Sequence, residues 1–496
     1  MTKNNILFFA VALIEGATVM CVELCCGKML SPYFGTSIQI WAAVLGLTLI
    51  ALMSGYYIGG AISAKNKHPK VICWLMLIAG CYVMLIPIIG EIIFPFTIQL
   101  NLTVGAVVSL ISLMLIPLIL FGAVSPLIIE QLSKETENAG KNSGYVYAVS
   151  TLGGIIATFI TGFYFMPVIG IAASLYVFGL AVIFVSLISF YITKSFKLIS
   201  LFFVSIAVAG LTFKDVENPG ILYESDGILG NIKVVERYFS DGKIYRELMV
   251  NNITQTIMDV ENPDQSLWNY VDVLAYNIHS YSNGDKMLLL GLGGGTLYKR
   301  LKKSDNKIDV IEIDERIEKI AKQYFFIEDE LNVIIDDARH YINTATKKYD
   351  VVIYDLFLSE TPPGHLMTSE AFAEIKNILN PTGILVINFY GFTTGKKGRA
   401  ARSLYLTLLN QEFDVEMVAT DGEEHQRNLL FICGKKPLIA SQPIIHKTIN
   451  KAELNLIDAE LLVDDKPVIE HLYLEAALQW RQDYNEANAK QFLSFK

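Results

Sequence analysis

The sequence predicts an α-helical transmembrane bundle, followed by a small β domain and a doubly wound α/β domain. Three observations predict this order. Long apolar stretches occupy the chain up to about residue 215. Strand-like and helix-like segments alternate from about residue 283 onward, which is typical of a mostly parallel sheet. Between the first such strand and helix lies a glycine-rich turn, GLGGGT, at 291–296.

The composition sets limits on the number of domains and on the partners. With 496 residues the chain is too long for one compact core, so two or three units are expected. The net charge of −9 argues against a nucleic-acid partner, which would favour a basic surface. The six cysteines contain no CxxC pair with metal spacing, so we expect neither a disulfide scaffold nor a metal site.

The first part, residues 1–215, predicts a multi-pass membrane domain in contact with the lipid bilayer. A spanning helix needs roughly 20 mostly apolar residues. About seven stretches approach this length: 5–27, 40–62, 71–93, 100–125, 145–166, 169–193 and 198–213. The last stretch is short and the least certain.

Lysines in the connections predict how the bundle is oriented. They gather between alternate stretches, at Lys65, Lys67 and Lys70, at Lys134 and Lys141, and at Lys194 and Lys197. Such loops face the cytoplasm. If 198–213 spans, the second part of the chain emerges outside, and if it lies in the interface, that part is cytoplasmic. Supply of nucleoside cofactors favours the cytoplasm, and span counting favours the outside. We lean slightly to the cytoplasm.

Two carboxylates lie inside the first apolar stretch. Glu15 and Glu23 are costly in a membrane, and such residues often mark a transport pathway or a paired site. Alternatively, Glu23 pairs with Lys28, or both acids form a polar seam that holds helices together. The sequence leaves these alternatives open.

The second part divides into three predicted segments. Residues 216–282 read as a small β-rich domain that ends in a helix at 266–281, and residues 441–496 read as a helical tail. Between them, residues 283–440 predict a Rossmann-like nucleoside-binding domain. Its strands are expected at 286–290, 308–313, 331–335, 349–354, 383–389 and 428–432. Its helices are expected at 295–303, 314–325, 338–346, 368–380 and 397–410.

Candidate binding residues follow the ends of these strands. Gly291, Gly293, Gly294 and Gly295 would let the backbone approach a ligand closely. Glu312 and Asp314, about 20 residues further on, stand where a carboxylate binds ribose hydroxyls. Asp336, Asp337 and Asp355 follow the next two strands. A single aspartate at such a position more often caps a helix, but the set predicts nucleoside binding.

These residues resemble the spermidine synthase (polyamine aminopropyltransferase) family, and in particular its membrane-fused branch, named fused MFS/spermidine synthase. The resemblance runs along nearly the whole chain. In the first part it rests on ELCCGKMLSPYFGTSIQIW (23–41), GYYIGG (55–60) and SGYVYAVSTLGG (143–154). In the second it rests on YESDGILGNIKVVE (223–236), VNNITQT (250–256), YVD (270–272), LLLGLGGGTL (288–297), IEID (311–314), DDARHY (336–341) and YDVVIYD (349–355).

The resemblance implies a methyltransferase-type Rossmann-like fold and a role for each matching residue. The 291–295 turn would hold decarboxylated S-adenosylmethionine or S-adenosylmethionine, with Glu312 on the ribose and Asp337 on the adenine. Asp355 would be the catalytic residue that helps deprotonate the attacking amine. Gln255 and Tyr270 would line the acceptor pocket. The family's soluble members also imply a homodimer.

Departures from the family pattern leave the reaction open. The glycine turn lacks the family's amine-binding aspartate, and Gly230, Val271 and Leu358 replace polar or acidic residues of its motifs. The first alternative is therefore a methyltransferase that acts on an apolar or membrane substrate. The second is a transporter whose soluble domain senses a nucleoside or a polyamine.

Overall fold

The structure is a computed structural model of the chain. It describes residues 3–35, 38–65, 68–100, 102–133, 139–192, 220–227, 229–238, 242–282, 284–302, 306–356, 362–443, 446–466 and 468–492. Contacts divide these residues into two compact units. One contains the N-terminal helices together with Glu224–Ile232, and the other contains Gly220–Tyr223 and Lys233–Lys496.

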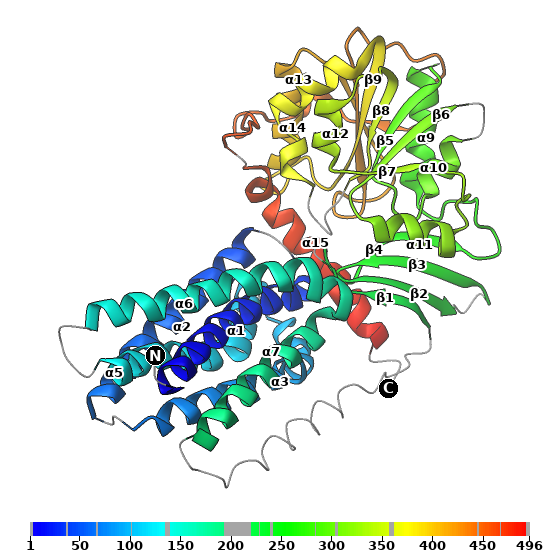
Figure 1. Ribbon diagram of the computed structural model, residues 1–496. Helices are drawn as coiled ribbons and strands as arrows, with labels where there is room; N and C mark the ends of the chain where they lie inside the picture. Colours follow the sequence, from blue (N-terminus) through cyan, green and yellow to red (C-terminus); the bar gives the residue numbers. More distant parts are fainter. Residues whose placement is uncertain are drawn as a thin grey trace. The chain divides into compact units, whose positions relative to one another are not determined.

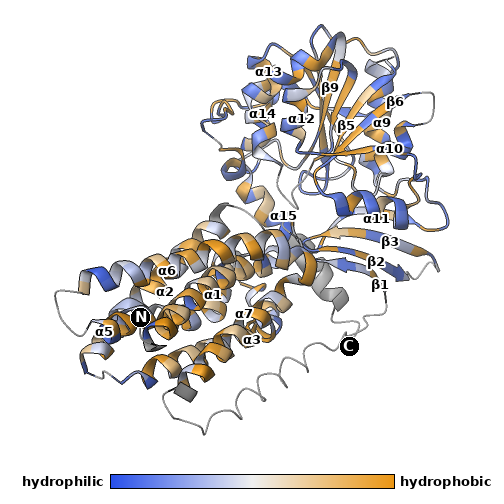
Figure 2. Cartoon of the chain, in the orientation of Figure 1, coloured by the Kyte–Doolittle hydropathy of each residue, from blue (hydrophilic) through white to orange (hydrophobic). Residues whose placement is uncertain are grey.

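The first unit is a bundle of long apolar helices, coloured almost entirely as hydrophobic in Figure 2. Its helices are α1 (Lys3–Phe34), α2 (Ile38–Lys65), α3 (Lys70–Thr97), α4 (Leu102–Leu110), α5 (Ile116–Leu132), α6 (Ala139–Ile160) and α7 (Met166–Ile192). Single π-helical turns at Ile111–Leu115 and Thr161–Phe165 join α4 to α5 and α6 to α7.

Five segments of the described chain are long and apolar enough to cross a membrane, fewer than the seven predicted. Part of the difference is the segment Ala139–Phe190, which combines two predicted spans in 52 residues. A straight helix of that length would be about 78 Å long, whereas the hydrocarbon core is about 30 Å thick. Gly170 interrupts the helix with φ 82° and ψ 173°, so the segment suits two crossings. The predicted stretch 198–213 lies outside the described residues.

Close backbone contacts hold the bundle together. A Cβ atom on Gly16 of α1 would lie 2.0 Å from the carbonyl oxygen of Ser150 on α6, and one on Gly153 would lie 2.0 Å from that of Leu13. Glycine is therefore required where these helices cross, as is common in membrane bundles. At the same crossing, the Ser150 hydroxyl donates a hydrogen bond to buried Glu15 at 3.0 Å.

The second unit begins with a four-stranded sheet in the order β1-β2-β3-β4. Its strands are β1 (Ile221–Ser225), β2 (Ile232–Tyr238), β3 (Ile244–Val250) and β4 (Ile253–Asp259). Asn251 and Asn252 form the tight turn between β3 and β4 with φ values of 51° and 59°, a geometry that asparagine tolerates well. Helix α9 (Asn269–Tyr281) leads into the larger sheet.

The larger sheet has eight strands in the order β12-β10-β11-β9-β8-β5-β6-β7. The strands are β5 (Lys286–Leu290), β6 (Lys307–Glu312), β7 (Val333–Ile335), β8 (Tyr349–Tyr354), β9 (Leu379–Tyr390), β10 (Asp414–Ala419), β11 (Asn428–Gly434) and β12 (Lys447–Thr448). Strands β5 to β9 pair in parallel, and β10, β11 and β12 are antiparallel. This is the predicted Rossmann-like, methyltransferase-type doubly wound fold.

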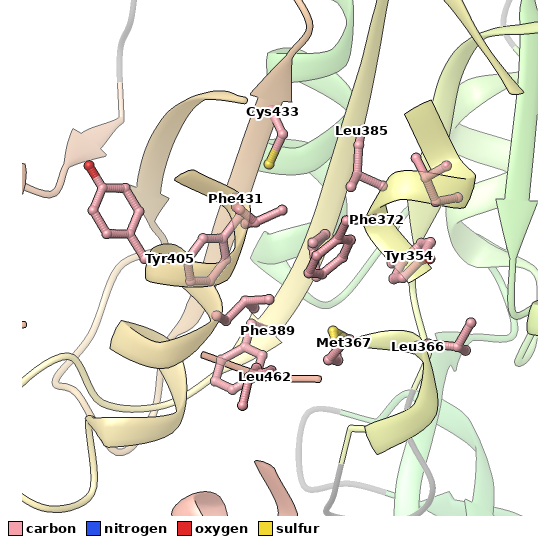
Figure 3. Close-up of a cluster of buried hydrophobic side chains, with 14 of the residues drawn as sticks. Tyr354, Leu366, Met367, Phe372, Leu385, Phe389, Tyr405, Phe431, Cys433 and Leu462 are labelled. Carbon is pink, nitrogen blue, oxygen red and sulfur yellow. The ribbon is translucent and has the colours of Figure 1, made fainter. Parts of the chain in front are cut away.

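Helices lie on both faces of this sheet. They are α10 (Thr296–Leu301), α11 (Glu315–Phe325), α12 (Ala338–Thr344), α13 (Ser369–Ile378) and α14 (Arg399–Asn410), with α15 (Ile469–Phe492) near the end of the chain. Figure 1 shows α12, α13 and α14 along one face and α9 and α10 along the other. Buried aromatic rings from β9, β11 and α13, including Phe389, Phe431 and Phe372, fill the first face (Figure 3).

Candidate active site

The predicted binding residues converge at the carboxyl ends of neighbouring parallel strands. From β5 the chain proceeds through β6 to β7 on one side, and β8 then pairs with β5 on the other side. In such sheets ligands bind outside the strand ends at the point where the direction reverses. The glycine turn follows β5 and Asp355 follows β8, and the Asp355 amide donates to the Leu290 carbonyl at 3.1 Å.

The glycine turn has a conformation that other residues could not adopt easily. Gly291, Gly293 and Gly295 have positive φ angles of 92°, 54° and 76°. Gly294 has no room for a side chain, because a Cβ atom there would lie 2.6 Å from Cγ2 of Thr256. The Thr256 hydroxyl accepts a hydrogen bond from the Gly294 amide at 2.9 Å, so strand β4 helps to fix the turn.

Glu312, at the end of β6, fastens the glycine turn from the other side. Its Oε2 accepts from the Leu292 amide at 3.0 Å, and its Oε1 accepts from the Asp314 amide at 3.0 Å. Burial raises the pKa of the Glu312 carboxyl, and these backbone donors act in the opposite direction. Each carboxylate oxygen can accept more than one hydrogen bond, so the group can also receive ribose hydroxyls.

Asp337 acts in the structure as the N-cap of α12. Its Oδ1 accepts from the amides of Arg339 and His340 at 2.8 and 3.1 Å, the usual role of an aspartate at this position. Asp314 caps α11 in the same way through the Arg316 amide. The other oxygen of Asp337 lies 3.2 Å from Nε2 of His365. A role for Asp337 on the adenine remains a prediction.

Asp355 accepts hydrogen bonds from two side chains. The Asn388 amide donates to Oδ1 at 2.8 Å, and the Tyr270 hydroxyl donates to Oδ2 at 3.4 Å. Burial raises the pKa of Asp355, and the two donors partly offset this. The pKa of Tyr270 is raised well above its usual range, mainly by burial and then by the charge of Asp355.

Asn388 was missed in the sequence, although the parallel pairing of β8 and β9 accounts for its position. Tyr354 pairs with Ile387, so the next residues along the two strands, Asp355 and Asn388, emerge together at the same edge. The side chain is 2% exposed and is held by a second amide, because Nδ2 of Asn428 donates to its Oδ1 at 2.9 Å. With its oxygen occupied in this way, Asn388 presents its NH₂ group to Asp355.

Gln255, the second predicted acceptor residue, lies at an irregularity in β4. Leu248 pairs with Thr256 and Met249 pairs with Thr254, which leaves Gln255 as the extra residue of a β-bulge. Bulges change the direction of side chains and are common beside active sites. The Gln255 amide donates weakly to the Ile253 carbonyl at 3.4 Å, whereas Tyr270 reaches Asp355.

This arrangement can bind a nucleoside and accept a proton beside it. A partly buried carboxylate with a raised pKa is better suited to take a proton from an ammonium group than an exposed carboxylate is. Among the residues that the structure describes, no three His, Cys, Asp or Glu side chains are grouped so that they could hold a metal ion.

Comparison with known proteins finds a family model that matches this part of the chain. The family model of the spermine/spermidine synthase domain matches residues 272–389, which include the glycine turn, Glu312, Asp355 and Asn388. Residues 272–389 are therefore similar to a spermine/spermidine synthase domain. A polyamine aminopropyltransferase of Vibrio vulnificus (strain CMCP6) is 32% identical over 145 residues, which cover 28% of this chain and 48% of that protein.

Two further similarities are to a curated relative and to a solved structure. A probable polyamine aminopropyl transferase of Bifidobacterium longum is 27% identical over 199 residues, 40% of this chain and 43% of that protein. The crystal structure of a probable spermidine synthase from Corynebacterium glutamicum has a TM-score of 0.38 and 19% identity, covering 45% of this chain and 82% of that one. The chain thus spans less than half the length of these two curated relatives.

Proposed function

We propose that this protein is an integral-membrane, multi-pass transferase of the polyamine aminopropyltransferase type. It would move an aminopropyl group from decarboxylated S-adenosylmethionine to a small-molecule amine. The observation that carries the proposal is the position of Asp355, which accepts from Tyr270 and Asn388 directly beside the glycine turn. Several curated proteins that match the chain bear aminopropyltransferase names, and another is an N-terminal histidine N-methyltransferase.

The proposed reaction needs a proton acceptor more than it needs an activated leaving group. The amine nitrogen attacks the carbon next to the sulfonium, a C–N bond forms, and the C–S bond breaks with its electron pair going to sulfur. The leaving group is then a neutral thioether. The proton released by the ammonium nitrogen goes to Asp355, while the glycine turn and Glu312 hold the nucleoside in position for attack.

A methyltransferase that acts on an apolar or membrane substrate is the second candidate. It is favoured by the departures at Gly230 and Val271, which remove polar side chains that the family uses for an amine. The apolar helices of the first unit would then bring the site to its substrate. The two candidates share the nucleoside site and differ in the donor and the acceptor.

A third candidate, a transporter with a sensing domain, rests on Glu15. This carboxylate is 2% exposed and lies between α1 and α6, where its described partner is the Ser150 hydroxyl. Uptake of labelled putrescine into proteoliposomes would favour transport. We propose a homodimer for either enzyme, because the family's soluble members imply one.

Mass spectrometry of the reaction products separates these functions. The detergent-purified full chain would be offered decarboxylated S-adenosylmethionine or S-adenosylmethionine together with mixed polyamines and membrane lipid. We expect an aminopropylated amine that is lost in Asp355→Asn and kept in the exposed control Asp329→Asn. A methylated product would replace the proposal with the methyltransferase, and the absence of turnover with both donors would contradict both enzymes.

A further inference from the structure

A loop that carries two acidic residues belongs to the helical unit. Residues 224–232 contain the end of β1, the connection to β2 and the first residue of β2, and their contacts group them with the helices. Oδ2 of Asp226 accepts from the Ile171 amide at 3.5 Å and lies 3.4 Å from where a Cβ atom of Gly170 would be. Asn231 steadies the loop by donating to Asp226 at 2.9 Å and to Glu224 at 3.2 Å.

Asp226 therefore meets α7 at its break. Gly170 leaves the helical conformation, so the amides that follow it lose their partners in the preceding turn. Ile171 is the first of these amides, and a carboxylate is a favoured acceptor at such a position. Backbone that departs from a helix at membrane depth must be satisfied by protein groups or water. This loop supplies one such group.

The contacts also show at which end of the bundle this break lies. The Ile171 carbonyl is 4.0 Å from the sulfur of Cys25, in the C-terminal third of α1. A Cβ atom on Gly105, near the start of α4, would lie 2.8 Å from the Phe34 ring and 2.3 Å from the Thr97 carbonyl. The ends of α1 and α3 thus meet the start of α4 at the end of the bundle that holds the break.

The opposite end of the bundle carries the lysines. Asn142 near the start of α6 donates to the carbonyl of Leu132 at the end of α5 at 2.9 Å. The C-terminal half of α7 lies there too, because Ser186 donates to the Cys73 carbonyl near the start of α3 at 2.7 Å. The described lysines of this end are Lys65, Lys70 and Lys141, and the sequence of the intervening connections also contains Lys67 and Lys134.

The end with the break is poor in basic residues. The connections 35–37, 98–101 and 166–170 contain no lysine or arginine, and neither does the loop 224–232. Lys28, within α1, lies over the Trp41 ring at 6.0 Å. Lysine-rich short connections face the cytoplasm. The break, and Asp226 with it, therefore belong to the non-cytoplasmic end.

We propose that residues 224–232 anchor the chain at the non-cytoplasmic end of the bundle, so that the synthase domain lies on the non-cytoplasmic side of the membrane. Helix α7 ends at the lysine-rich side, so the chain must cross once more before residue 220. The proposal therefore requires the predicted seventh span at 198–213, which lies outside the described residues. The candidate site would then meet its nucleoside donor and its acceptor outside the cytoplasm, the opposite of the side that cofactor supply favours.

Labelling of single introduced cysteines with a membrane-impermeant maleimide tests the proposed side. All six native cysteines are buried or partly buried, so the unmodified chain provides the background. Asp264→Cys reports the synthase side, and Lys141→Cys reports the lysine-rich end, both at exposed positions. In intact spheroplasts we expect labelling of Asp264→Cys alone, with Lys141→Cys reacting only after the membrane is permeabilised.

Labelling of both positions from one side, or of Lys141→Cys alone, would overturn the proposal. The result does not depend on turnover, so it is independent of the proposed enzyme function.

The anchoring contact is tested by the midpoint of thermal unfolding in detergent. We expect this midpoint to fall in Asp226→Ala and to recover in Asp226→Asn, because asparagine also caps a helix. An unchanged midpoint in Asp226→Ala would contradict the anchoring contact.

Discussion

Removal of the Asn388 amide should shift the pH dependence of the reaction to higher pH. In Asn388→Ala, Oδ1 of Asp355 loses the donor that lies 2.8 Å away. Since the donor stabilises the ionised carboxylate, its loss raises a pKa that burial has already raised. A hydrogen bond to a charged group contributes about 1.5–3 kcal/mol, and 1.36 kcal/mol corresponds to one pKa unit. The pKa of Asp355 should therefore rise by about one to two units.

The measurement is the pH profile of kcat/KM, whose acid limb reports the ionisation of the free enzyme. If ionised Asp355 receives the proton, the acid limb in Asn388→Ala moves up by about one to two pH units. Activity below the limb falls by about 10- to 100-fold, whereas activity well above it approaches that of the unmodified protein. The free energy of unfolding should also fall more at high pH, where the lost bond was to the ionised form.

The same two strands provide a matched control. At their opposite ends, Asn380 of β9 donates to Oδ1 of Asp350 of β8 at 2.6 Å. Asn380→Ala removes the same kind of bond far from the strand ends that hold the site, so it should lower stability but leave the acid limb in place. An acid limb that stays in place in Asn388→Ala, or that moves equally in Asn380→Ala, would refute the reasoning.

Three further changes address the donor and acceptor halves of the site. Glu312→Gln replaces one acceptor oxygen by an NH₂ group that faces a backbone amide. Affinity for the nucleoside co-substrate, measured by calorimetry, should therefore fall about 10- to 100-fold. Unchanged affinity would contradict this role. Gly294→Ala should lower the thermal midpoint, since overpacking costs about 1–3 kcal/mol, and Thr256→Ser should partly restore it by removing the methyl group 2.6 Å away. Tyr270→Phe removes the longer hydrogen bond to Asp355, of 3.4 Å. The acid limb of its pH profile should therefore move less than that of Asn388→Ala, and an equal or larger shift would contradict this expectation.

Local patterns were sufficient to predict most of the larger sheet. The strands β5 and β8 contain the continuous apolar runs 287–290 and 351–354, because parallel strands are buried on both faces, and both strands lie where the sequence predicted them. Strand β10 was missed because Asp414 and Glu416 interrupt its apolar residues. It forms a strand by pairing antiparallel with β11, although its own sequence does not predict one.

Some residues of the candidate site could not be predicted from the sequence, for a different reason. A glycine turn and a following acid form a local pattern, so Glu312 could be singled out by its spacing from the turn. Asn388 has no such pattern around it. It becomes significant only because β9 lies next to β8 in the sheet. Similarly, the sequence could not decide whether Asp337 caps a helix or binds a ligand, since one short segment suits both roles.

The site takes its two halves from different parts of the fold. The proposed donor half comes from the ends of β5 and β6, where Glu312 and the glycine turn bond directly to each other. The proposed acceptor half comes from β8, β9 and α9, through Asp355, Asn388 and Tyr270. Because no described side-chain bond joins Glu312 to these three residues, a change in the acceptor half should alter turnover and pH dependence while donor affinity is kept. This separation would allow the acceptor to differ from that of the matching aminopropyltransferases while the proposed nucleoside site is kept.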